Sequence, residues 1–79
     1  MSLSFRNLKR GEIYLLTRER ILRESNTGAH RTIPTGAHFL VVDKQVDRRL
    51  VSAAYRVLVD GTLGILALCE GDIAPVEGG

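Results

Sequence analysis

The dipeptide Asp60-Gly61 constrains the fold of this 79-residue chain more than any other feature of its sequence. It separates two runs of β-prone residues, 55–59 and 62–68. Both central residues of a type I′ turn have a positive φ, which glycine adopts freely and aspartate tolerates. The sequence therefore predicts a β-hairpin with a two-residue turn over residues 55–68.

This turn fixes which side chains lie opposite each other, and the result is a hairpin with two apolar faces. One face pairs Val59 with Thr62, Val57 with Gly64, Tyr55 with Leu66 and Ala53 with Leu68. The other pairs Leu58 with Leu63, Arg56 with Ile65 and Ala54 with Ala67. A barrel of this size has one interior, so one face needs another cover. Either the N-terminal segment folds over it through Leu3, Phe5 and Leu8, or a partner chain does, which makes Leu58, Leu63, Ile65 and Arg56 candidate interface residues.

The rest of the chain divides into short segments punctuated by glycine, proline and asparagine. The expected elements are a strand at 12–17, a loop at 24–36, a strand at 37–44, a charged connection at 43–49 and a last strand at 73–76. A helix over 12–24 is the alternative to the first strand, because its residues include good helix formers. Pro75 cannot donate a ladder hydrogen bond, so the last strand belongs at a sheet edge. We expect the barrel interior to consist of Val57, Val59, Phe39, Val41 and Ile13.

This order of elements resembles that of the Src-homology-3-like (SH3-like) small β-barrels, which include KOW and Tudor-like domains. The resemblance rests on Lys9-Arg10-Gly11-Glu12-Ile13, Ile33-Pro34-Thr35-Gly36, Val57-Leu58-Val59-Asp60-Gly61 and Gly71-Asp72-Ile73-Ala74-Pro75-Val76. It implies an all-β, five-stranded barrel with a long first loop and a short turn before the last strand. Such barrels bind peptides, nucleic acids, ribosomes or protein complexes, so the fold does not choose the partner. A proline-rich ligand is disfavoured, because the chain has no tryptophan and only four aromatic residues.

Length and composition indicate one domain over 1–79, with a lead-in segment at 1–10 and the barrel at 11–77. The single cysteine, Cys69, excludes an internal disulfide, and the N-terminus has no secretory pattern. No apolar run is long enough to span a membrane. These features predict a cytoplasmic protein.

Positive charge gathers in the first part of the chain. Residues 1–31 hold seven basic and three acidic side chains, whereas 32–79 hold four and six. Arg18, Arg20, Arg23 and Arg31 fall in or beside the long first loop, where they could bind nucleic acid or another anion. Tyr14 and Tyr55 are the candidates for stacking on bases. The alternative is that these arginines only solvate the surface, since glutamates interrupt them.

No catalytic constellation emerges from the sequence. His30 and His38 are the only histidines and Cys69 the only thiol, and their spacing is not that of a zinc site. No phosphate loop or nucleophile elbow is present. We therefore expect no metal, no cofactor and no enzymatic activity. The sequence favours a small accessory or inhibitor-type protein, of a kind common in viral genomes, that contacts a protein partner or further copies of itself; nucleic-acid or anion binding through the arginine loop is the alternative.

Overall fold

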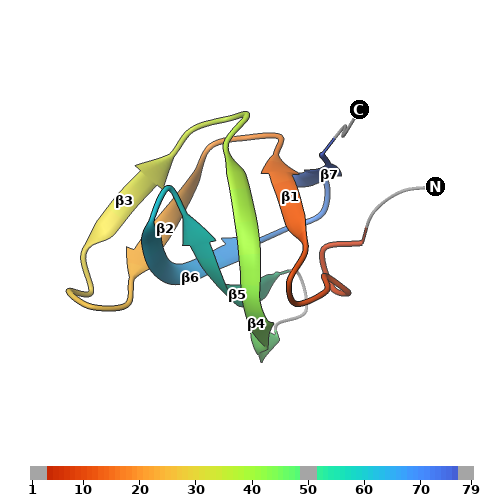
Figure 1. The fold of residues 1–79 in the computed structure, drawn as a ribbon. Coiled ribbons are helices and arrows are strands. Elements are labelled where there is room, and N and C mark those ends of the chain that lie inside the picture. The colour runs from red at the N-terminus through yellow and green to blue at the C-terminus, as the bar shows by residue number, and fades with distance from the viewer. Residues whose placement is uncertain (1–3, 49–51, 77–79) are drawn as a thin grey trace.

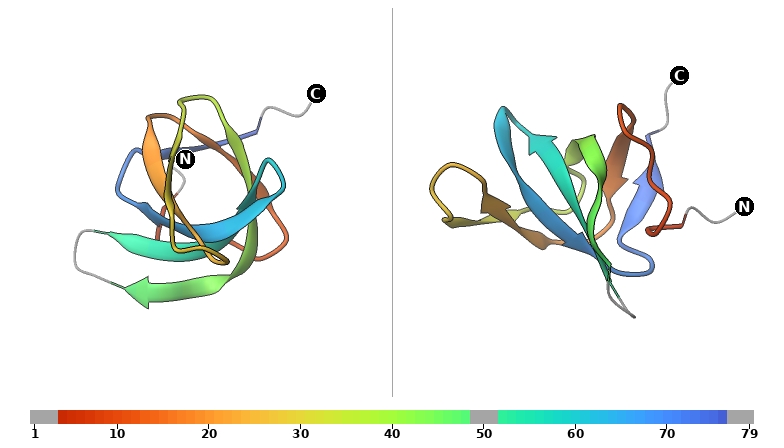
Figure 2. Two further views of the ribbon diagram at one scale, coloured as in Figure 1. Left: turned by 90° about the vertical axis from the view of Figure 1, so that its left-hand side faces the viewer. Right: turned by 90° about the horizontal axis from the view of Figure 1, so that it is seen from below.

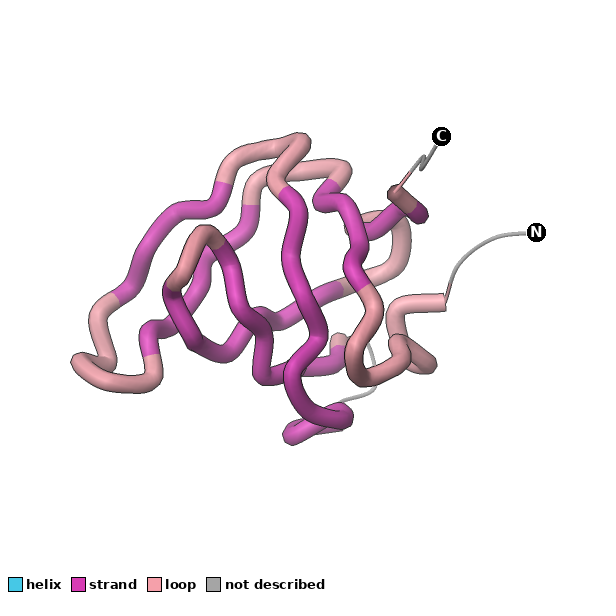
Figure 3. Tube along the Cα trace, viewed as in Figure 1, coloured by secondary structure: helices cyan, strands magenta, loops and turns pink. Residues whose placement is uncertain are grey.

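The computed structural model describes residues 4–48 and 52–76, and these form seven strands and no helix (Figures 1 and 3). The strands are β1 (Ile13–Leu16), β2 (Arg20–Glu24), β3 (His30–Ile33), β4 (His38–Arg48), β5 (Ala53–Val59), β6 (Thr62–Leu68) and β7 (Ile73–Pro75). They build one antiparallel sheet in the order β3-β2-β6-β5-β4-β1-β7. The all-β prediction is confirmed, and the helix considered for 12–24 is not formed.

The sheet curls around an apolar interior without closing on itself (Figure 2). Its two edges are β3 and β7. The edge position of β7 agrees with Pro75, which has no N–H to offer a further strand. Five strands, β1 and β4–β7, occupy the five segments expected from the sequence, and β2 and β3 are additional.

The Asp60-Gly61 hairpin forms as predicted. Asp60 and Gly61 have φ values of 52° and 80°, as a type I′ turn requires. All seven predicted cross-strand pairs of β5 and β6 are present, from Val59 opposite Thr62 to Ala53 opposite Leu68. The local turn chemistry was therefore sufficient to set the register over 53–68.

The interior contains one face of this hairpin and the inward side chains of its neighbours. Phe39, Val41, Val57 and Val59 are buried there, as expected. Ile13 was placed there wrongly, because Tyr14 and Leu16 are the inward residues of β1 and alternation turns Ile13 to the outside, where it is 52% exposed.

The segment expected to be a loop at 24–36 contains β3, which pairs with β2 in a hairpin. Asn26 and Gly28 lie in the turn that joins these two strands, with Gly28 at a φ of 72°. Only Leu22 of β2 and Ile33 of β3 are buried. A hairpin with so few inward apolar residues lacks the alternation by which a strand is recognised in sequence.

The prediction of a charged connection at 43–49 is also wrong, because strand β4 continues to Arg48. Its second half pairs with β5 through Gln45, Asp47 and Arg48, after register shifts at Val41/Gln45 and Gln45/Asp47. Such shifts mark β-bulges, which bend a strand and increase its twist. Pairing with β5 therefore keeps this polar segment of β4 in an extended conformation.

The N-terminal segment packs against the interior, with Phe5 and Leu8 buried, and these two residues do not cover the outward face of the hairpin as one of the two alternatives expected. The Tyr55 hydroxyl donates to the Phe5 carbonyl at 2.8 Å and accepts from the Leu8 amide at 3.3 Å. The Tyr14 hydroxyl accepts from the Lys9 amide at 3.1 Å. Both tyrosines belong to the inward face of the sheet, so the segment covers an end of the interior; Leu3 lies outside the described residues.

Candidate functional site

The outward face of the sheet carries a row of aliphatic side chains that crosses four strands. The register places Ile13 of β1 opposite Leu40 of β4, Leu40 opposite Leu58 of β5, and Leu58 opposite Leu63 of β6. Leu58 and Leu63 are each 36% exposed, Ile13 is 52% exposed and Leu40 is half-buried. We call these four residues the leucine row.

Two further aliphatic side chains extend this surface. Val42, two residues after Leu40 on the same strand, is 37% exposed. Ile65, two residues after Leu63, is half-buried and lies opposite Arg56. The outer face of β4, β5 and β6 is therefore apolar over adjacent strands, which is the arrangement expected of a contact surface.

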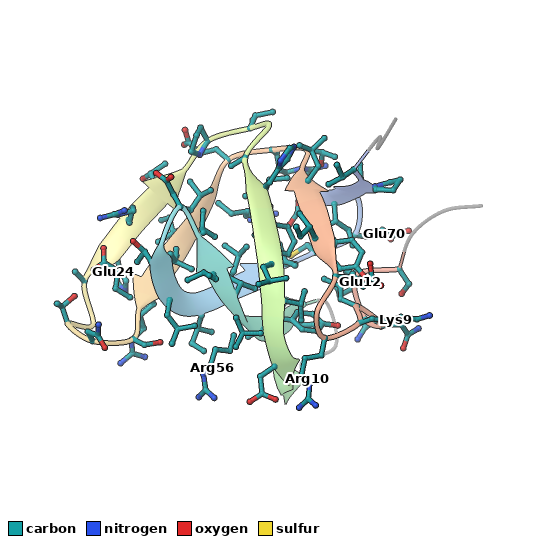
Figure 4. All side chains as sticks on the ribbon, viewed as in Figure 1. Lys9, Arg10, Glu12, Glu24, Arg56 and Glu70 are labelled. Atoms are coloured by element: carbon teal, nitrogen blue, oxygen red, sulfur yellow. The ribbon has the colours of Figure 1, made fainter. Side chains whose placement is uncertain are left out.

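Charged side chains of both signs border the leucine row. Arg56 Nη1 donates to Asp43 Oδ2 at 3.2 Å, and both side chains are 43% exposed. Figure 4 shows Arg56 extending away from the ribbon. On the far side of Ile65 lies Arg23 of β2, which is exposed. An apolar centre with a polar rim is the usual anatomy of a protein interface.

The structure thus brings all four predicted interface residues together on one face: Leu58, Leu63, Ile65 and Arg56. The sequence interpretation missed Ile13, Leu40 and Val42. Their membership follows from the pairing of β1, β4 and β5, which no local sequence signal specifies.

The four arginines predicted to bind an anion are spread over three environments. Arg18 and Arg20 approach the fully buried carboxylate of Asp72, with Nε–Oδ1 at 3.0 Å for Arg18 and Nε–Oδ2 at 2.7 Å for Arg20. Arg31 Nε lies 3.1 Å from Glu24 Oε2, and its Nη1 donates to the Thr62 hydroxyl at 3.2 Å. Arg23 is the exposed member beside Ile65. Three of the four therefore already neutralise an acidic side chain of the same chain.

The Asp72 carboxylate joins the start of β7 to the segment that leads into β2. Arg20 Nη2 donates to Oδ1 at 2.9 Å, and the Cys69 amide donates to Oδ2 at 2.7 Å. The N–H of Arg20 Nε does not point at the carboxylate, so that contact is an ion pair without a hydrogen bond. The hydrogen bond to Asp72 raises the pKa of Arg20, against the opposing effect of burial. The cluster is built as a structural clamp.

Tyr14 and Tyr55 do not present a ring to solvent. Tyr55 is 1% exposed and Tyr14 8%, and both hydroxyls are bonded to the N-terminal segment. The stacking surface that base recognition requires is therefore not formed by these two residues.

Groups that would carry other chemistry are not assembled in the part of the chain that the structure describes. No three His, Cys, Asp or Glu side chains there could hold a metal ion together. His30 begins β3 and His38 begins β4, both exposed, and Cys69 is half-buried beside the clamp. No helix in residues 4–48 and 52–76 could cross a membrane.

The fold and the site together define a class: a single antiparallel β-sheet domain with an apolar outer face. Comparison with known proteins does not assign the chain to a family within this class, because no family model, curated protein or solved structure matches it.

Proposed function

We propose that this protein is a non-enzymatic cytoplasmic interaction module that binds a protein surface through the leucine row. The observation that supports the proposal is that Ile13, Leu58 and Leu63 stay accessible although the N-terminal segment packs elsewhere. The two covers considered for this face were that segment and a partner chain. Because Phe5 and Leu8 of that segment pack into the interior, a partner chain is the better supported cover for this face.

The partner surface that complements this face is apolar with charges of both signs at its border. A second copy of the chain supplies such a surface. A two-fold rotation sets the leucine row against itself and brings Arg56 of one copy toward Asp43 of the other, which is the self-complementarity that a symmetric dimer requires. Because the four aliphatic side chains are already partly covered, burying the remainder contributes only a few kcal/mol, on the order of 2–4. Association itself opposes this gain, so we propose a weak dimer.

We further propose that the sheet is an elaborated SH3-like barrel. Strands β1, β4, β5, β6 and β7 take the places of its five strands, and the β2–β3 hairpin takes the place of the long first loop. The tight hairpin between β5 and β6 and the pairing of β7 with β1 support this assignment. An experimental structure in which these five strands superpose on SH3-like barrels tests it, and a different winding would overturn it.

The variant Leu63→Glu tests the contact surface. A carboxylate at the centre of the leucine row would be desolvated in the dimer but remains in water in the monomer. We expect light scattering from millimolar to micromolar protein to show a concentration-dependent dimer for the wild type and a monomer for Leu63→Glu, with the melting temperature changed by a few degrees at most.

The matched control is Thr35→Glu, which adds the same charge at an exposed turn that is not part of the row. This variant should dimerise like the wild type. If the wild type is a monomer at every concentration, the dimer is excluded and the leucine row is left for a different protein. If Leu63→Glu dimerises unchanged, the contact lies elsewhere.

A further inference from the structure

Strand β3 is an edge strand: one side pairs with β2 and the other side is open. The backbone groups on the open side are arranged to accept another strand. Topology gives it one neighbour, β2, among the described residues. The Glu24 amide donates to the Ala29 carbonyl at 2.8 Å, and the Ser25 amide donates to the Leu63 carbonyl at 2.9 Å. Even-numbered residues of β2 therefore bond to β3, and odd-numbered ones bond to β6.

The alternation of an antiparallel ladder then fixes the direction of the β3 backbone groups. Arg31 and Ile33 lie opposite Leu22 and Arg20 and bond to them. His30 and Thr32 lie opposite Arg23 and Ile21 as non-bonded pairs. The N–H and C=O groups of His30 and Thr32 consequently point away from the sheet, toward the open edge.

An open hollow of about 490 Å³ lies along this edge. It is bounded by β3, the segment that follows it and the turn of the β5–β6 hairpin. Its apolar lining comes from Ile33, Ala37 and Val59, and its polar lining includes Arg31, His38 and Asp60. A strand added beside β3 can therefore place an apolar side chain against this hollow instead of leaving it in solvent.

We infer that β3 takes up an extended peptide as an additional antiparallel strand, and that the peptide carries an apolar residue followed two positions later by an acidic one. The residue opposite Ile33 then faces the apolar lining of the hollow. In an antiparallel pair the residue two places later lies opposite Arg31 and on the same side, where a carboxylate faces the guanidinium. Main-chain bonds to His30 and Thr32 supply the affinity that is independent of side chains.

Charge on the β2–β3 hairpin favours an acidic occupant. Between residues 20 and 33 the chain has three arginines and a single glutamate, Glu24; Arg20 faces Asp72, so Arg23 and Arg31 are the arginines that Glu24 is left to balance. That glutamate contacts Arg31 through Nε, while the Arg31 side chain remains 49% exposed. Figure 4 places Glu24 near the end of the β2–β3 hairpin. The site is separate from the leucine row and does not depend on the proposed function.

The probe is a fluorescein-labelled peptide of alternating threonine and valine in which the second residue after the central valine is glutamate; a second peptide has lysine at that position. Fluorescence anisotropy up to millimolar protein measures binding, with Leu63→Glu as the background so that the leucine row does not interfere. We expect the glutamate peptide to bind about two- to thirtyfold more tightly than the lysine peptide, because an opposite-charge cross-strand pair is stabilising and a like-charge pair is destabilising. Equal binding of the two peptides, or no binding, overturns the inference.

Two variants then locate the peptide. Thr32→Pro removes an outward N–H without removing a bond to β2, whereas its control Thr32→Ala keeps that N–H. Binding should be lost in the first and unchanged in the second, with amide shifts on peptide addition confined to 30–38 and 59–60. Should Thr32→Pro fail to fold, Arg31→Glu decides, because it should reverse the preference to the lysine peptide. A proline variant that folds and binds normally, an unchanged preference in Arg31→Glu, or shifts centred on Leu58 and Leu63 would each exclude strand addition at β3.

Discussion

At the scale of single residues, Asp72 has the most demanding environment. A fully buried carboxylate is stable only when charges and donors replace the water it has lost. Here two guanidinium groups and the Cys69 amide do so, and the Thr17 hydroxyl bonds to the neighbouring Gly71 carbonyl. In the sequence Asp72 looks like an ordinary turn residue. Its role becomes visible only when the fold brings Arg18 and Arg20 to it from more than fifty positions away.

Asp72→Asn keeps the size of the side chain and an oxygen for the Cys69 amide, but it removes the charge that both arginines face. We expect the free energy of unfolding to fall by about 1–3 kcal/mol, less than for a fully buried pair because Arg18 is largely exposed. Urea denaturation measures the loss. Glu70→Gln, which neutralises an exposed carboxylate two residues earlier, should change the stability by less than about 0.5 kcal/mol. Equal stability of Asp72→Asn and the wild type would show that the clamp contributes nothing.

At the scale of elements, the β2–β3 hairpin joins the rest of the sheet through the pairing of β2 with β6, which includes Gly64. A Cβ atom at this position would stand 2.5 Å from the Arg23 carbonyl oxygen and 2.9 Å from Leu22 Cγ. Gly64 is buried and its φ is not in the left-handed region, so the lack of a side chain is required by space and not by backbone conformation. The sequence showed only a glycine within a strand, and such a glycine does not indicate which strand approaches it.

Gly64→Ala should push β2 away from β6 and lower the free energy of unfolding by about 1–3 kcal/mol, as overpacking does. Methyl NMR signals of Leu22 should shift at the same time. Gly11→Ala distinguishes steric overlap from backbone strain. A Cβ atom at position 11 meets nothing within 4 Å, whereas the φ of +88° disfavours any residue with a side chain. That control should lose stability without moving the Leu22 methyl signals. Unmoved signals in Gly64→Ala would mean that the hairpin is attached elsewhere.

At the scale of the whole molecule, sequence predicted best where structure is local. The Asp60-Gly61 turn set the full register of β5 and β6, and Pro75 set the edge position of β7. Prediction failed where a segment is held by distant partners: β2 and β3 are strands because β6 pairs with β2, and the second half of β4 because β5 does. For the same reason half of the leucine row was found from the hairpin alone, while Ile13 and Leu40 required the long-range pairing.

Val59→Asp tests the interior that these strands share. Val59 lies beside the turn but faces inward and is 5% exposed, so an unpaired carboxylate there should cost several kcal/mol against a total stability of about 5 kcal/mol. We expect loss of the cooperative thermal transition followed by circular dichroism. Leu58→Asp places the same charge one residue earlier on the outward face and should retain the transition. A Val59→Asp protein that melts like the wild type would invert the two faces of the hairpin.

The clamp at Asp72 also has a consequence for synthesis of the chain, which proceeds from the N-terminus. Arg20 leaves the ribosome 52 residues before the carboxylate that it faces, and Phe5 leaves it 50 residues before Tyr55, whose hydroxyl donates to the Phe5 carbonyl. The β2–β3 and β5–β6 hairpins, in contrast, join segments that are made within moments of each other. One edge of β1 therefore stays without its partner until β7 has emerged, and during that interval the fate of the growing chain depends on the speed of translation and on any chaperone that covers this edge.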